Sequence, residues 1–377
     1  MSITEFSRKS PFLNKLAIVL FCMIALGYLI NVGQDVIVPI ALAISLAILL
    51  LPMNSFFERK GISRVLSIVI SIIVSLLVIA GIIYFFSHEI ALFIADIPRI
   101  KGQLQHHVYT VQKWVFNQFH LTNSEQTQYF NKATAEIQDN KGGFIGATFL
   151  TITNSIMFLV FLPIYTFLIL YYRDMIRLFL INIFADEHKD HVLHVMRESR
   201  SIVNGYMVGL LIEMAIITLI NFIGFLIVGI KFAFFLALFA AILNMIPYIG
   251  MLIAGIVCML VTLATSDHLM NVIWVAVVLT IVQFFDNNII MPKIVSSKVK
   301  INALATIIGV LIGGAIAGVS GMFLSIPTVA IIKVIFDRIP EMQPWGAILG
   351  DEITMNSKGR LIRKLAEAKM RRKRVAA

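Results

Sequence analysis

A short polar segment that closes an apolar run carries side chains able to bind cations or hydroxylated solutes. Within ten residues it holds three amides, a carboxylate and a proline: Gln283, Asp286, Asn287, Asn288 and Pro292. Proline lacks an N–H, so a carbonyl one turn earlier loses its helical partner. That carbonyl, the amides and the carboxylate can together ligate a cation or a hydroxylated solute. The alternative is a helix end that emerges into lipid headgroups, where Lys293 pairs with Asp286.

A second carboxylate, Glu213, lies within the apolar run 202–230. An acidic side chain near the centre of a membrane helix costs about 2.5–3.5 kcal/mol on insertion scales. We therefore predict that Glu213 faces the protein interior. It either carries a proton or a cation, or is a protonated structural acid that hydrogen-bonds to a neighbouring helix.

One long apolar stretch, residues 232–265, is broken only by the sequence Asn-Met-Ile-Pro-Tyr-Ile-Gly that ends at Gly250. A straight helix of this length would extend about 50 Å, whereas the hydrocarbon core is about 30 Å thick. Pro247 and Gly250 allow the chain to turn. Asn244 and Tyr248 can bond to the backbone groups that a turn exposes. A turn is therefore favoured over a plain kink.

A second long apolar stretch, residues 301–337, poses the same problem of length and is rich in glycine. Its glycines are Gly309, Gly313, Gly314, Gly318 and Gly321, and the pairs 309/313 and 314/318 each form a small-xxx-small pattern. Small residues at this spacing let helices approach closely. Packing is their default role. The alternative, functional hypothesis is that these glycines form a surface on which a moving hairpin slides. Gly313, Gly314 and Gly318 would then border the path of a solute.

The composition indicates which elements must position these residues. Of 377 residues, 59% are hydrophobic and 14% charged, whereas soluble domains carry about 25% charged residues. Lipid must therefore surround most of the chain. Six apolar runs have the length of single spans, at about 14–31, 36–57, 65–86, 144–171, 202–230 and 271–290. We predict an all-α, polytopic transmembrane helix bundle with about six full spans, two re-entrant hairpins and a small extramembrane helical lobe; the alternative has eight spans.

The distribution of lysines favours the hairpins. Residues 266–271 carry no Lys or Arg, whereas residues 291–300 carry three lysines. Basic loops face the cytoplasm, and only two hairpins place the basic loop inside and the neutral loop outside. The first hairpin then enters from outside and the second from inside. Both termini are expected to be cytoplasmic, in a bacterial inner membrane.

Four regions follow from this layout: N-terminal spans (1–86), an extramembrane amphipathic lobe (87–142), a membrane core (143–337) and a basic cytoplasmic tail (338–377). In the lobe, the adjacent His106 and His107 are interpreted as solvated, because neighbouring helical residues point in different directions. In the tail, nine of 17 residues from 358 to 374 are Lys or Arg. No nucleic-acid-binding motif accompanies them, so anionic headgroups are the expected contact.

The sequence contains none of the motifs of hydrolases, zinc proteases or P-loop nucleotide sites. We therefore predict no enzyme activity, no metal site and no cofactor. Cys22 and Cys258 lie in apolar runs without ligand-like spacing, which is typical of core or lipid-facing thiols. Oppositely oriented helix breaks around a central site recur in transporters, and here an ion gradient or a partner would have to supply the energy.

Three motifs resemble the autoinducer-2 exporter (AI-2E) family of bacterial permease-like proteins. They are the Ile-Pro-Tyr-Ile-Gly sequence that ends at Gly250, Asp286 followed by Pro292-Lys-Ile, and the glycine-rich segment that ends in Ser325-Ile-Pro. The order of apolar runs agrees over nearly the whole chain. Met251 departs from the family, in which many members have proline at that position, and this leaves the substrate open.

The resemblance implies a secondary transporter that assembles as a homo-oligomer, expected to be a pentamer. Three functions remain open. The first is gradient-driven export of a small polar solute such as autoinducer-2, with Asp286, Asn287, Asn288 and the hairpin tips along the path and Glu213 carrying the proton. The second is sodium(lithium)/proton antiport by the same acids. The third is a membrane scaffold that transports nothing. The expected partners are the solute or ion, the lipid bilayer and other copies of the chain.

Overall fold

The computed structural model describes residues 11–100, 102, 103, 109, 113, 160–247, 249–296 and 299–350. These residues form helices joined by short turns, without a β-strand. Most of the predicted lobe with its histidine pair, Tyr248, and the tail beyond residue 350 lie outside the described residues.

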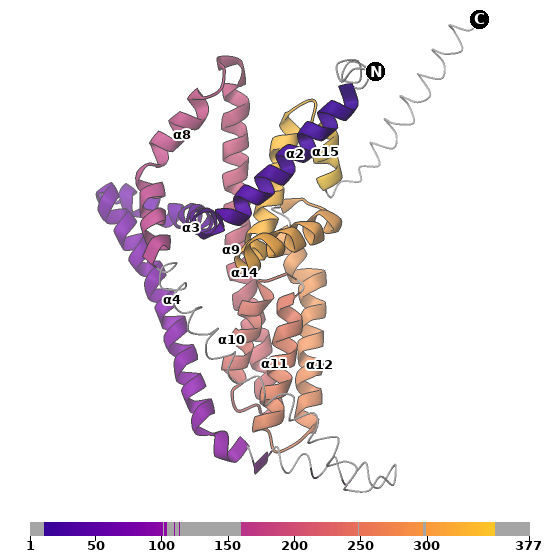
Figure 1. Cartoon of the computed structure of the whole chain (residues 1–377). Coiled ribbons are helices and arrows are strands. Elements are labelled where there is room, and N and C mark those ends of the chain that lie inside the picture. The colour runs from indigo at the N-terminus through magenta and orange to yellow at the C-terminus, as the bar shows by residue number, and fades with distance from the viewer. Residues whose placement is uncertain are drawn as a thin grey trace, which may run out of the picture.

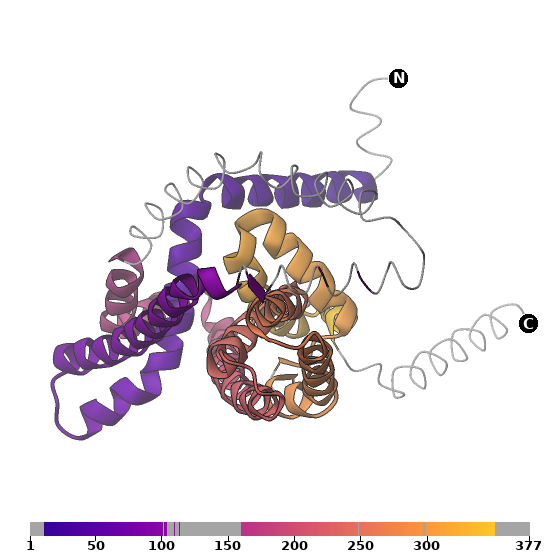
Figure 2. The same ribbon diagram turned by 90° about the horizontal axis from the view of Figure 1, so that it is seen from below.

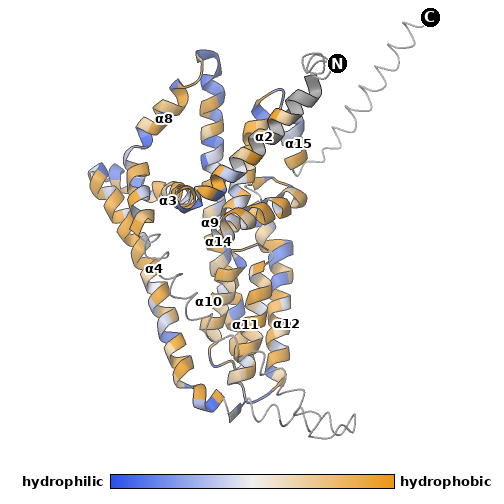
Figure 3. Ribbon diagram, in the orientation of Figure 1, coloured by the Kyte–Doolittle hydropathy of each residue, from blue (hydrophilic) through white to orange (hydrophobic). Residues whose placement is uncertain are grey.

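The predicted all-α polytopic bundle is confirmed. By length and composition alone, five of the described helices could cross a membrane, although one of them, Ala303–Arg338, turns back on itself as described below. Figure 3 shows hydrophobic residues along most of the length of α4 and of α10 to α12. Large apolar side chains on these helices are exposed on the surface of the chain, Leu77, Leu252 and Ile273 among them. Such a surface requires lipid or another apolar partner.

The N-terminal region contains three helices: α2 (Pro11–Val32), α3 (Gln34–Arg59) and α4 (Arg64–Ala95). Only Gly33 separates α2 from α3, and α3 lies across the direction of α4 (Figures 1 and 2). The charged turn predicted after α3 is present, and Gly61 adopts a left-handed φ of 88° there. Helix α4 continues through Ala95, beyond the span predicted to end near residue 86, because its apolar helical pattern persists.

The longest helix forms the central axis of the fold. After an apolar helix at Val160–Tyr171 come α8 (Arg173–Asn182), the 3-10 turn η1 (Asp186–His188) and the 40-residue α9 (Lys189–Val228). Helix α9 begins well before the predicted run 202–230, since its polar first turns are helical too. It ends at Gly229, whose left-handed φ of 80° stops the helix.

The turn predicted within the first long apolar stretch is confirmed. Helix α10 (Ala233–Asn244) and helix α11 (Ile249–Thr265) pack against each other after a turn, and we call them the first hairpin. Helix α12 (Met270–Phe285) follows and continues as two π-helical segments, η2 (Asp286–Ile290) and η3 (Pro292–Ser296). Helices α9, α10, α11 and α12 contact one another in a ring, which Figure 2 shows nearly along their axes.

The second long apolar stretch also reverses direction. Helix α14 (Ala303–Arg338) contains two non-helical residues, Ala317 and Gly318, and the latter has a φ of 55°. Gly313 lies against the backbone of Gly321, although residues eight apart in a continuous helix are separated by about 12 Å. The two arms therefore fold back on each other, and we call residues 303–338 the second hairpin.

Both ends of the second hairpin lie on one side of the molecule. The backbone N–H of Asn302, before its first arm, donates to the carbonyl of Leu349, at the end of α15 (Gln343–Leu349). Arg338, at the end of its second arm, donates to Glu198 in the first part of α9 over 3.3 Å. The first hairpin has its ends near the other end of α9. The two hairpins thus approach the middle of α9 from opposite ends.

Two hydrophobic clusters fix this arrangement. In the first, the early part of α9 around Tyr206 packs against Val310 and Ile326 of the second hairpin. In the second, Phe225 near the end of α9 packs against Leu236 and Cys258 of the first hairpin. Lipid tails are as apolar as these side chains, so close van der Waals packing, and not removal from water, holds both hairpins to α9.

Candidate functional site

The boundary between the two clusters is polar. Glu213 lies there on α9 with only 5% of its surface exposed, between Leu210 of the first cluster and Ile217 further along. Its neighbours one turn away on this helix face, Leu210 and Ile217, are apolar. A carboxylate in such a place is costly unless other groups bind it.

Asn244 joins Glu213 to a second carboxylate. It is the last residue of α10, at the tip of the first hairpin. Its side-chain amide nitrogen lies 3.0 Å from Oδ2 of Asp286 and 3.4 Å from Oε1 of Glu213. The two bonds connect α9, the hairpin tip and the end of α12. We call Glu213, Asn244 and Asp286 the acid pair with its amide bridge.

Asp286 is buried because the helix does not end there. Only 2% of its surface is exposed, and it begins the π-helical segment η2. Pro292 has no N–H to donate one turn back, and the wider π turn lets the helix continue past it. At this local widening Asp286 is buried beside the tip of the first hairpin and is not at an exposed helix end.

Each acid of the pair has one further oxygen that is buried and lacks a hydrogen-bond partner within the described residues: Oε2 of Glu213 and Oδ1 of Asp286. Neither carboxylate forms an ion pair with a basic side chain in the part of the chain that the structure describes. Two carboxylates that share a buried site repel each other unless a proton or a cation lies between them. The arrangement is therefore suited to bind and release a small positive charge.

The tip of the first hairpin reaches this level of α9. Met245, beside the amide bridge, packs against the first cluster, which contains residues of α9, of η3 and of the second hairpin. Gly250 lies directly against the carbonyl of Leu243, so that a Cβ there would overlap with the backbone of the other arm. Pro247 lies in the intervening turn. The close approach of the arms holds Asn244 in place between the acids.

The other predicted site residues lie elsewhere. Asn287 and Asn288 are exposed on the outer face of the helix, where they bond to Gln283 and to the carbonyl of Phe284. Pro292 is exposed as well. The glycines Gly313, Gly314 and Gly318 shape the second hairpin instead of contacting the acids: Gly313 meets Gly321, Gly314 meets Met322, and Gly318 forms the turn.

Two further buried polar residues of α9 escaped prediction. Tyr206 and Asn221 are 1% and 2% exposed, and the hydroxyl of the former and Oδ1 of the latter have no partner among the described residues. The sequence did contain a signal for them, because Tyr206 and Asn221 lie seven and eight residues from Glu213 and therefore share its helix face. Single polar residues in apolar runs are, however, common enough to pass unnoticed.

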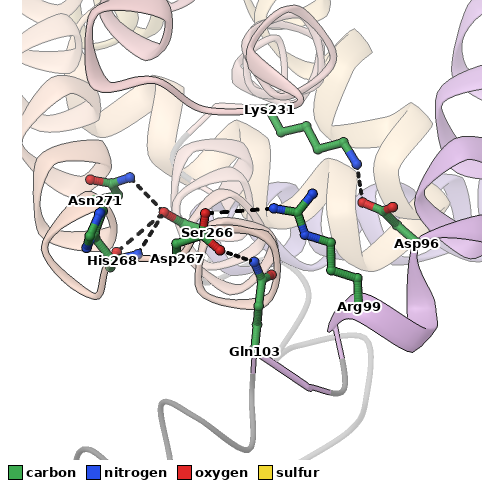
Figure 4. Close-up of polar contacts among 8 residues, drawn as sticks. All are labelled: Asp96, Arg99, Gln103, Lys231, Ser266, Asp267, His268 and Asn271. Carbon is green, nitrogen blue, oxygen red and sulfur yellow. Dashed lines mark hydrogen bonds and ion pairs between the residues drawn. The ribbon is translucent and has the colours of Figure 1, made fainter.

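Charged contacts tie the outer helices to the ends of this core. At one end, Lys231 pairs with Asp96, while Asp267 pairs with Arg99 at 3.7 Å and accepts from Gln103 at 2.6 Å (Figure 4). These contacts hold both ends of the first hairpin to the segment that follows α4. Among the outer helices themselves, two ion pairs join the end of α3 and the start of α4 to the start of α8: Glu58 with Arg173 and Arg64 with Asp174, both at 2.7 Å.

Comparison with known proteins supports a transport role. A family profile described as AI-2E family transporter matches residues 16–341. A putative transport protein of Mycobacterium tuberculosis is 23% identical over 317 residues, which cover 83% of this chain and 85% of the relative. The putative transport protein YueF of Bacillus subtilis is 25% identical over 302 residues, covering 76% and 80%. The putative permease PerM of Escherichia coli is 32% identical over 149 residues, covering 40% and 42%.

The profile spans most of the chain, and the relatives are named as transport proteins or permeases and not as enzymes. The fold agrees with this, since its apolar helices require a membrane and two buried carboxylates lie at the tip of a helical hairpin. The chain therefore belongs to the AI-2E transporter family and is a multi-pass membrane transporter.

Proposed function

We propose that this protein is a secondary transporter of the bacterial inner membrane that exports a small polar solute such as autoinducer-2. The acid pair with its amide bridge couples the export to an ion gradient. The supporting observation is that Asn244 bonds both Glu213 and Asp286 in the interior. Binding of a proton or cation to the acids changes the charge that the hairpin tip contacts.

The coupling follows from which elements carry the three residues. Glu213 belongs to the long helix α9 and Asp286 to the end of α12, whereas Asn244 belongs to the tip of a hairpin. An amide N–H bonds more strongly to an ionised carboxylate than to a neutral one. Loss of a proton therefore strengthens the hold on the tip, and gain of a proton weakens it. Movement of the tip then opens the site toward one side at a time.

The proposed orientation places the two termini and the second hairpin's ends in the cytoplasm. The ends of the first hairpin, with the predicted lobe of residues 87–142, face the outside. Lys293 and Lys300 then lie near the cytoplasmic surface, as basic residues do in membrane proteins. The tail beyond residue 338 carries its positive charge to the same surface.

A second candidate is sodium(lithium)/proton antiport at the same acids. Two buried carboxylates with unpaired oxygens favour it, since carboxylate and amide oxygens ligate hard cations. Asn287 and Asn288, exposed on the outer face, take no part in such a site within one subunit. In an oligomer they can face a neighbouring copy of the chain instead.

Purified protein in liposomes loaded with a pH-sensitive dye separates these functions. In the proposed export, autoinducer-2 moves in exchange for protons, sodium alone evokes no proton movement, and Asp286→Asn or Glu213→Gln abolishes both fluxes. In the antiport, sodium alone evokes proton movement. If neither flux occurs, and if each variant returns a deletion strain fully to the wild-type phenotype, the protein is the non-transporting scaffold and the proposal is wrong.

A further inference from the structure

One face of α9 carries buried polar groups on both sides of the acid pair. Tyr206, Glu213 and Asn221 each have no more than 5% of their surface exposed, and each has an oxygen without a partner among the described residues. At 100° per residue these three positions fall within about 80° of arc, and they span about 22 Å of the helix axis. They form a row along one face of the helix, which we call the polar face of α9.

Each member of the polar face meets a different part of the fold. Tyr206 belongs to the cluster around the second hairpin, where its ring lies 6.4 Å from that of Phe323. Glu213 lies at the tip of the first hairpin, where Asn244 donates to it. Asn221 lies between Ile217 and Phe225, which pack against the first hairpin. The polar face therefore passes the second hairpin, the acid pair and the first hairpin in turn.

The first hairpin presents small side chains and a further polar group to this interior. The buried stripe of α11 consists of Gly250, Ala254, Cys258, Thr262 and Thr265. The hydroxyl of Thr262 is also buried and lacks a partner within the described part of the chain. A buried hydroxyl or amide oxygen without a protein partner is normally satisfied by ordered water.

We propose that the polar face of α9 is a water-lined route that brings protons to Glu213, with Tyr206 on the approach past the second hairpin and Asn221 on the approach past the first. Their oxygens bind the waters that relay the proton, and neither residue exchanges a proton with the acids directly. Since each approach runs along one hairpin, movement of that hairpin opens or closes one side only. The inference rests on the proposed proton coupling at Glu213.

Cysteine labelling tests the route without any need for transport. Cys22→Ser and Cys258→Ala provide a background in which Tyr206→Cys and Asn221→Cys carry single thiols. A charged, membrane-impermeant methanethiosulfonate reacts with the ionised form of a thiol. A thiol ionises only where water reaches it, so labelling reports water access. Leu219→Cys is the matched control, since it lies two residues from Asn221 but is 58% exposed on the outer surface of the helix, toward lipid.

The expected result is sided labelling. Asn221→Cys reacts with reagent added at the end that carries Lys231, Tyr206→Cys reacts from the opposite end, and Leu219→Cys reacts from neither. Labelling is measured as a mass shift of protein that elutes as a folded species. If Asn221→Cys and Tyr206→Cys are no more reactive than Leu219→Cys from either side, the water-lined route does not exist, whatever the transport activity.

Conservative variants test the relay itself. Tyr206→Phe removes only the hydroxyl, and Asn221→Leu replaces the amide with a side chain of similar size. Each should slow dye-reported proton movement about tenfold, the factor that corresponds to one lost hydrogen bond. Asn221→Ser should restore most of the rate because it returns an oxygen. Unchanged rates in both Tyr206→Phe and Asn221→Leu, with Glu213→Gln inactive, would overturn the relay while leaving the proposed function intact.

Discussion

The close approach of the two arms of the first hairpin makes Gly250 and Gly255 a matched pair of test positions on α11. A Cβ at Gly250 would overlap with the carbonyl of Leu243, whereas a Cβ at Gly255 has no atom within 4 Å. We predict that Gly250→Ala destabilises the protein and that Gly255→Ala stabilises it slightly. Both changes add the same methyl group to the same helix, so the difference between them isolates the contact at the tip.

The expected magnitudes follow from two opposing effects. Replacing glycine by alanine inside a helix favours folding by about 1 kcal/mol, and Gly255→Ala should show this gain. At Gly250 the overlap is with backbone, which cannot rotate away as a side chain can. Overpacking of this kind costs about 1–3 kcal/mol. Taking the upper end for a backbone clash gives a net loss of roughly 2 kcal/mol and a difference of roughly 3 kcal/mol between the two variants.

Thermal unfolding of the detergent-solubilised protein measures this difference. At about 2–4 °C per kcal/mol for larger chains, the midpoint of Gly250→Ala should lie roughly 6–12 °C below that of Gly255→Ala. Gly250→Ala should also lose transport, since its tip no longer holds Asn244 between the acids. Equal midpoints for the two variants would refute the tight hairpin tip, and so would a Gly250→Ala variant with full activity.

Three shorter predictions concern other parts of the fold. Gly321→Ala should separate the arms of the second hairpin at Gly313 and lower the unfolding midpoint, and a midpoint equal to that of wild type would argue for a straight α14. Lys231→Ala should change stability by less than about 1 kcal/mol, because ion pairs between partly exposed groups contribute little; a loss above 2 kcal/mol in urea titration would show that the contact is essential. Asp267→Cys should be labelled from outside intact cells and Lys300→Cys only after permeabilisation, and the reverse pattern would invert the proposed orientation.

The hairpins could be predicted from sequence because their signals are local. A stretch too long for one span, with proline and glycine near its centre, leaves few ways to stay within a membrane. For the second stretch, the turn falls at Gly318, within the glycine-rich segment that the sequence indicated. The position of the lysines predicted from which side of the membrane each hairpin enters, and this orientation remains a prediction.

The site was harder to predict because its residues meet only through the fold. The sequence grouped Asp286 with Asn287 and Asn288, since they are neighbours in the chain. On a helix, however, consecutive residues point in different directions, and the two amides face outward. The partner of Asp286 is Asn244, 42 positions away. No periodicity within either helix reveals that contact, which depends on the packing of the hairpin tip.

The most direct test of the coupling site is a double-mutant comparison of proton movement in liposomes. Glu213→Gln and Asp286→Asn keep the shape of each side chain and remove its charge. If the two acids act as one unit through Asn244, each single variant loses nearly all proton movement, and the double variant is no slower than either. Losses that multiply in the double variant would show that the acids act independently, and a single variant with wild-type proton movement would contradict a shared site altogether.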